Sequence, residues 1–475
     1  MSETSISVNR LIEIENQELI SIIITSRFVI PKENYISGHD IRRKKIGIYG
    51  LLEAPMLKRY THVYESIIIC LILFIIWNLS SINHNEFFSN EYENVNESSI
   101  LSDTELNQKY CGSSQCKFLF LYKVIEQESK ARKHFKQFVQ IAQKLDRTLV
   151  LTNVGESRIG ACLKYPFTYY YSKEFLQQNY PDLRVITQQQ FSEWTRLRRQ
   201  KPSSHQILFQ ESHKLGFVEN EPILSKLKSD LCHGEFEVDF DNIKFYNLSM
   251  GVLKPGKIHK NLLNFIFDTL KRFDDVEILL MNQKFHYEFF PKLVPDLKYA
   301  PHILDKALTI TQHLQPFIAA QWRMELGNPL NMPRCAEKLV SHVESLKVIY
   351  NTRNFYLATD YPLKDSLSQS FTFGNVKMEY HGKAIEILKD RIDFLSWLNY
   401  TSTDQFGNEM DVKDFAHSGI PGILDKIVCS RAKIFLTAPP DCRKRTSSYT
   451  KMINSERLSL MKTGVNGIDN INFEW

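Results

Sequence analysis

The sequence lacks the short glycine-rich signatures of the best-known nucleotide and nucleophile sites: it contains no GxGxxG, Walker A or GxSxG motif. Its cysteines and histidines do not show zinc-ligand spacing, so no metal site is predicted. It has no internal repeat and no long basic stretch interleaved with aromatic residues, and its net charge is only +5, which argues against nucleic acid as a partner. A nucleotide site in this chain must therefore rest on several weaker signals taken together.

What is present is the composition of a globular protein, with 43% hydrophobic and 24% charged residues. A chain of 475 residues is too long for one ordinary hydrophobic core, so two domains are expected.

A strongly apolar run occupies residues 63–82, which is about the length that a helix needs to cross a bilayer. Six Lys or Arg and one acidic residue lie in residues 42–59, whereas residues 83–109 carry six acidic residues and one basic residue. Because basic residues stay on the cytoplasmic side, we predict a cytosolic tail at 1–62, a signal anchor at 63–82 and a lumenal remainder. The alternative is a buried core helix.

The residues beyond this run suit an oxidising compartment. Three N-glycosylation sequons begin at Asn96, Asn247 and Asn399. Seven cysteines follow the run, so at least one stays unpaired or pairs between chains. We predict a disulfide between Cys429 and Cys442 first, and one between Cys111 and Cys116 next.

After a polar stem at 83–109, apolar strands alternate with amphipathic helices. Strands are predicted at 116–122, 148–152, 276–281, 317–322, 354–358 and 433–437. Helices are predicted at 127–145, 261–273, 302–314, 334–346, 383–392 and 421–432, while about 180–257 is less regular. This alternation predicts an α/β protein with parallel sheets, as two Rossmann-like domains at 110–300 and 301–475 with a cleft between them.

Polar residues follow several of these strands, where ligands bind in open α/β sheets. Arg323 and Glu325 follow the strand at 317–322, and Asp360 follows the strand at 354–358. Ser447 and Ser448 stand at the head of a helix, where backbone N–H groups favour phosphate. A rigid arginine fork suits a diphosphate. The alternative is structural: Arg323 pairs with Glu325 or Asp360, and the serines only cap a helix.

Four stretches resemble the GDP-fucose O-fucosyltransferase superfamily: QWRME at 321–325, YLATDYP at 356–362, the segment 424–450 from Asp425 to TSSYT, and the helix at 126–151. The resemblance implies a GT-B fold and a type II, single-pass membrane protein of the Golgi or endoplasmic reticulum. It also implies inverting, metal-independent transfer of fucose from GDP-fucose to a hydroxyl of a protein or glycan.

The resemblance also implies roles for individual residues. Arg323 would hold the β-phosphate and stabilise the departing GDP, and Asp425 would contact the guanine. Ser447, Ser448 and Tyr449 would bind the phosphates and the ribose. We expect Glu325 and Asp360 in the same GDP-sugar site.

The acceptor side is predicted from the first domain. Glu126 matches the position of the catalytic base in one branch of the family, and Glu128 is a neighbouring candidate. Arg158, in the loop 153–162, is a further acceptor-side candidate.

Two departures from the family pattern motivate an alternative function. Gln321 stands where many members have histidine, and the loop at 122–131 lacks the glycines that usually let the backbone approach the nucleotide. The alternative is a catalytically degenerate, membrane-tethered protein of the same fold that binds a nucleotide or a glycan. A transferase that uses another GDP-sugar is a third possibility, since no residue here discriminates between sugars.

Overall fold

The computed structural model describes residues 101–251, 261–286, 288, 296–325, 327–363, 376–400, 412–443 and 447–475, which all belong to one unit, Ser99–Trp475. The predicted span at 63–82 lies outside these residues, as do the predicted cytosolic tail and most of the stem. No helix within the described ranges is both long enough and apolar enough to cross a membrane.

The first of two large sheets is built around β1, Phe118–Val124, which is buried along nearly its whole length because helices cover both faces. The strand order is β5-β2-β1-β9-β6-β8-β7. The other strands are β2 Thr148–Leu151, β5 Val185–Thr187, β6 Ser204–Gln210, β7 Leu215–Asn220, β8 Lys244–Met250 and β9 Ile278–Gln283. A separate hairpin joins β3, Val154–Gly155, to β4, Arg158–Ile159.

The second sheet has the order β11-β10-β12-β13, and its neighbouring strands are parallel. Its strands are β10 Phe317–Trp322, β11 Asn354–Thr359, β12 Ile434–Thr437 and β13 Phe473–Glu474. The strands predicted at 317–322, 354–358 and 433–437 are confirmed, because short apolar runs of this kind are buried on both faces of a parallel sheet.

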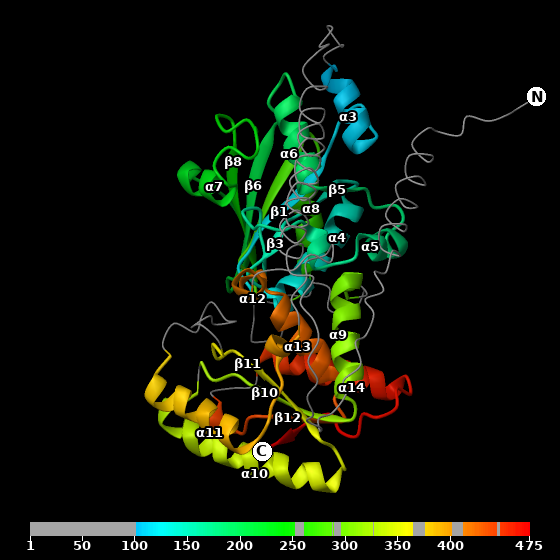
Figure 1. Cartoon of the computed structure of the whole chain (residues 1–475). Helices are drawn as coiled ribbons and strands as arrows, with labels where there is room; N and C mark the ends of the chain where they lie inside the picture. The colour runs from blue at the N-terminus through cyan, green and yellow to red at the C-terminus, as the bar shows by residue number, and fades with distance from the viewer. Residues whose placement is uncertain are drawn as a thin grey trace, which may run out of the picture. The chain divides into compact units, whose positions relative to one another are not determined.

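A helix overlaps each of the six predicted helical segments. They are α3 Asp103–Cys111, α4 Glu128–Lys144, α5 Lys173–Asn179, α6 Gln188–Leu197, α7 Leu224–Asp230, α8 Leu262–Leu270, α9 Pro301–Leu314, α10 Met332–Ile349, α11 Lys383–Arg391, α12 Val412–Ser418, α13 Ile420–Arg431 and α14 Ser448–Lys462. Figure 1 shows α10 and α11 on one side of the second sheet and α9, α13 and α14 on the other.

Residues 180–251, the described part of the segment predicted to be less regular, depart from the prediction, because they are regular and supply β5 to β8 of the first sheet. The prediction of parallel sheets is also wrong at one edge, where β7 pairs antiparallel with β8 and makes the sheet mixed. The residues of β7 are all at least partly exposed, so this edge strand lacks the apolar run that reveals a buried strand in a sequence.

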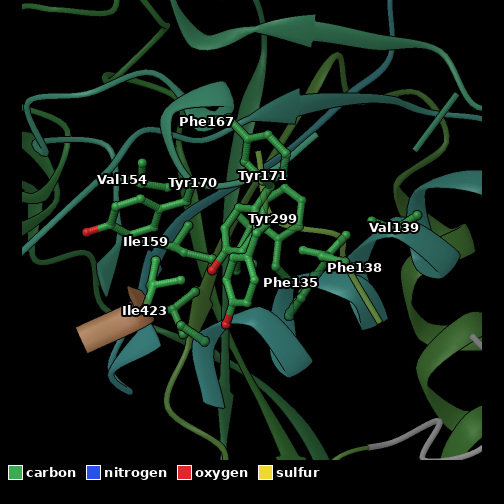
Figure 2. Packing of buried hydrophobic residues seen from close by; sticks show 14 of the residues in the cluster. Phe135, Phe138, Val139, Val154, Ile159, Phe167, Tyr170, Tyr171, Tyr299 and Ile423 are labelled. Carbon is green, nitrogen blue, oxygen red and sulfur yellow. The ribbon is translucent and has the colours of Figure 1, made fainter. Parts of the chain in front are cut away.

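A continuous hydrophobic core joins the two sheets. One cluster contains Leu119 and Leu121 of β1 together with Ala319 of β10 and Leu424 of α13. Figure 2 shows part of it, where aromatic side chains pack around α4 and Ile423 of α13 lies beside them. The elements that carry the site are therefore held together by shared apolar contacts.

The disulfides differ from the prediction in one respect. The Cys111–Cys116 bond is confirmed, but the predicted Cys429–Cys442 bond is wrong, since Cys442 bonds to Cys335 and Cys429 is a buried free thiol. Cys429 lies inside α13, whereas Cys442 lies after β12 near the start of α10, where Cys335 stands. A third bond joins Cys162 to Cys232.

Candidate active site

A cavity of about 620 Å³ lies at the carboxyl ends of β10 and β11 and is also lined by residues that surround the start of α4. All of the predicted site residues except Glu325 line it: Glu126, Glu128, Arg158, Arg323, Asp360, Asp425, Ser447, Ser448 and Tyr449. Residues that are distant in the sequence are thus brought to one crevice, which the strand-end argument predicted.

Arg323 directly follows β10, and its side chain is 31% exposed. Its guanidinium pairs with the Glu325 carboxylate and lies 4.0 Å from a carboxylate oxygen of Asp360. Glu325 is only 2% exposed, so it acts on the cavity through Arg323. The structural pairing considered above is therefore present, and it holds the guanidinium at the cavity wall without burying it.

Asp360 organises the loop that carries Arg323. Its carboxylate accepts hydrogen bonds from the backbone N–H groups of Met324 at 2.7 Å and Glu325 at 3.2 Å. Burial raises the pKa of Asp360 to about 7, against the opposing effects of the Met324 N–H group and the Arg323 charge. Asp360 thus determines where the arginine stands.

Asp425 projects from α13 and is 2% exposed. The Tyr356 hydroxyl donates a hydrogen bond of 2.6 Å to its carboxylate. Burial raises the pKa of Asp425 to about 8, although this hydrogen bond lowers it. A carboxylate inside a helix is ordinarily solvated, but Asp425 is a buried acid at a cavity wall.

The start of α14 forms another wall. Ser447 is its N-cap, since its hydroxyl accepts the N–H of Thr450 at 3.0 Å. Thr450 donates to the Gln321 side-chain oxygen at 2.8 Å, and the Tyr449 hydroxyl donates to the Gly422 carbonyl at 2.6 Å. These hydroxyls are engaged within the protein, so the first N–H groups of the helix and the exposed Ser448 hydroxyl, which lines the cavity, are the groups here that can meet an anionic ligand.

Glu126 approaches the cavity from the first sheet, just before α4. Its Oε1 atom accepts a hydrogen bond of 2.9 Å from Lys130 and also contacts Nδ1 of His286. Burial raises the pKa of Glu126, but Lys130 and His286 together lower it below its usual value. Glu126 is therefore ionised at neutral pH, as a general base must be.

Glu128 lines the same cavity but is engaged differently. One oxygen accepts hydrogen bonds from Tyr171 and Tyr299, and the other pairs with Lys426 of α13 at 2.6 Å. Burial raises the pKa of Glu128. The charges of Lys426 and Arg132 lower it by more than burial raises it, so the pKa falls below its usual value. Both oxygens are occupied, so Glu126 is the better candidate for a base.

Arg158 is held on the β3–β4 hairpin and donates a hydrogen bond of 2.9 Å to the carbonyl of Ile125. The hairpin meets α13 at Gly419, whose φ of +86° favours glycine. A side chain at Gly419 would collide with the Tyr170 hydroxyl and the backbone of Ser157. This close approach places Arg158 at the cavity.

Among the described residues there is no group of three or more His, Cys, Asp or Glu side chains that could hold a metal ion. Two closely spaced carboxylates that could suggest a metal site, Asp239 and Asp241, lie in a turn before β8. There the Asp239 carboxylate accepts hydrogen bonds from the backbone N–H groups of Asp241 and Asn242. It is not part of the cavity lining.

A family model described as GDP-fucose protein O-fucosyltransferase matches residues 129–458, which is well over half of the chain. The chain belongs to this family. It is therefore a glycosyltransferase of the O-fucosyltransferase family. The matched residues begin just after Glu126 and Glu128, so the family model does not cover these two acids.

Three solved structures are similar to this fucosyltransferase family member. POFUT1 in complex with GDP-fucose aligns with a TM-score of 0.39 and 14% identity over 72% of this chain and 94% of its own. Fucosyltransferase NodZ from Bradyrhizobium aligns with a TM-score of 0.33 and 10% identity, over 72% of this chain and 92% of its own. An Arabidopsis thaliana FUT1 mutant in complex with GDP aligns with a TM-score of 0.32 and 10% identity, over 80% of this chain and 76% of its own. No curated protein sequence matches the chain significantly.

Sequence reasoning missed three residues that hold the two glutamates of the site: Lys130, His286 and Lys426. Lys130 lies in the first turn of α4, four residues after Glu126, and this spacing is a signal for an ion pair. His286 and Lys426 lie 160 and 298 residues from their carboxylate partners, so no local pattern could have paired them.

Proposed function

We propose that this chain transfers fucose from GDP-fucose to a hydroxyl of a protein or glycan, with inversion at the anomeric carbon. A single observation carries the proposal: one cavity is lined by Arg323, Asp425 and the start of α14 from the second sheet, and by Glu126 from the first. In this proposal the two sheets are the cores of the two Rossmann-like domains of a GT-B fold, at 110–300 and 301–475.

In the proposed donor site, the ionised form of Asp425 accepts N–H groups of the guanine base, and the first N–H groups of α14 bind the diphosphate. Because the Ser447 and Tyr449 hydroxyls are engaged within the protein, their backbone contributes more than their side chains. Arg323, held by Glu325 and Asp360, faces the β-phosphate.

The proposed reaction is a single displacement. Glu126 takes the proton of the acceptor hydroxyl as its oxygen bonds to the anomeric carbon, and the bond from that carbon to the β-phosphate oxygen breaks. Negative charge grows on the departing GDP, where Arg323 and the α14 N–H groups oppose it. Because these groups supply positive charge, the proposed reaction is independent of metal ions.

We also propose that the catalytic part lies in the lumen of the Golgi or endoplasmic reticulum, anchored by residues 63–82. Three disulfides among the described residues support an oxidising compartment.

The test uses the full chain with GDP, GDP-fucose and GDP-mannose. We expect GDP binding by calorimetry, GDP release from GDP-fucose in excess EDTA, and a rate loss of about a hundredfold or more, roughly 3 kcal/mol, in Arg323→Ala. Arg391→Ala, at an exposed arginine of α11, is the matched control and should keep the wild-type rate.

The possible outcomes separate the hypotheses. Absence of GDP binding would end the proposal. Binding of GDP without turnover of any GDP-sugar would favour the degenerate binding protein, and turnover of GDP-mannose alone would change the donor. A requirement for Mn²⁺ together with full activity of Arg323→Ala would refute the proposed mechanism.

A further inference from the structure

The carboxylate of Glu126 is held on one side only. Lys130 and His286 both contact Oε1, and within the described ranges Oε2 has no hydrogen-bond partner. The Glu126 side chain is 16% exposed and lines the cavity. One oxygen is thus anchored, and the other is left for a ligand.

The two groups that hold Oε1 differ in rigidity. Lys130 stands one turn further along the chain and reaches Glu126 through a flexible four-carbon side chain. His286 follows β9, and its stiff imidazole ring is half exposed. An ionised carboxylate can only accept hydrogen bonds, so Nδ1 of His286 carries the hydrogen and donates it. The imidazole therefore fixes the direction of the carboxylate more closely than the lysine does.

We propose that His286 is a positioning residue that orients Glu126, so that Oε2 receives the proton of the nucleophile. This inference rests on the proposed function. In the step, the O–H bond of the nucleophile breaks and its proton passes to Oε2. The nucleophile's oxygen bonds to the anomeric carbon, and the electron pair of the breaking sugar–phosphate bond leaves with GDP. The proton later passes from Glu126 to water, and His286 remains a donor throughout.

Water can serve as the nucleophile, so the test needs no identified acceptor. The rate of GDP release from GDP-fucose and the Kd for GDP are measured for the full chain and its variants. We expect His286→Ala to slow GDP release about tenfold with an unchanged Kd. His286→Asn, whose amide nitrogen replaces Nδ1, should recover most of the rate. His342→Ala, at an exposed histidine of α10 that lines no described cavity, is the control.

A second background tests whether His286 acts through Glu126. In Glu126→Gln, which slows release, we expect His286→Ala to have no further effect, because the group that it orients is no longer a base. The inference is overturned if His286→Ala releases GDP at the wild-type rate, if the asparagine variant is as slow as alanine, or if the tenfold loss persists in Glu126→Gln. A wild-type chain that releases no GDP overturns the proposed function, and this inference with it.

Discussion

The buried ion pair between Glu128 and Lys426 links α4 to α13, and its removal should destabilise the protein strongly. The two side chains are 6% and 7% exposed, and their charged atoms lie 2.6 Å apart. Lys426→Met preserves most of the volume but leaves the Glu128 carboxylate, among the described residues, with two tyrosine hydroxyls as its hydrogen-bond donors. Removing one partner of a buried ion pair costs about 3–5 kcal/mol, and we expect the free energy of unfolding to fall by that amount.

The size of this stability loss depends on the buried negative charge that Glu128 keeps in the variant. A second substitution that removes this charge should therefore restore stability. In the double variant Lys426→Met with Glu128→Gln, a neutral amide can still accept hydrogen bonds from both tyrosines. Replacing both charges of a buried pair is often nearly neutral, so we expect the double variant to lie within about 1 kcal/mol of the wild type.

The assay is equilibrium unfolding of the full chain in urea, followed by tryptophan fluorescence. Lys389→Met, at an exposed lysine of α11, is the matched control and should change stability by less than about 0.5 kcal/mol. A loss below about 1 kcal/mol for Lys426→Met, or a double variant whose loss equals the sum of the single losses, would refute this account of the pair.

Two further predictions concern Asp425 and the longest disulfide loop. The pKa of Asp425 is about 8 in the folded chain, far above its ordinary value. Between about pH 4 and 8, the folded state therefore keeps a proton that the unfolded state loses. Over this range the free energy of unfolding should fall by about 1.4 kcal/mol for each unit that the pH rises. Asp425→Asn should remove that slope, and urea unfolding at pH 5 and pH 7 measures it. The Cys335–Cys442 bond closes a separation of 107 residues, so Cys335→Ala with Cys442→Ala should lower the unfolding free energy by about 3–5 kcal/mol. Peptide mapping without reduction checks the pairing, and a Cys429–Cys442 peptide would contradict it.

Local sequence patterns predicted those parts of the site whose residues lie close together in the sequence. The apolar run of β10, the arginine after it and the serine that caps α14 can each be read from a few neighbouring residues. In an α/β sheet, polar residues at the ends of parallel strands share one edge, so Arg323, Asp360 and Ser447 could be assigned to one crevice before the strand order was known.

The sequence by itself therefore determined the secondary-structure alternation, the family and nine of the residues that line the cavity, because these depend on periodicity and short motifs. Only the tertiary structure decided which carboxylate keeps one oxygen for a ligand, which cysteine is unpaired and which charges meet across the two sheets. Glu126 and Glu128 are two residues apart, yet His286 and Lys426, from distant segments, give them different surroundings. Such pairings arise from long-range packing, which no local periodicity encodes.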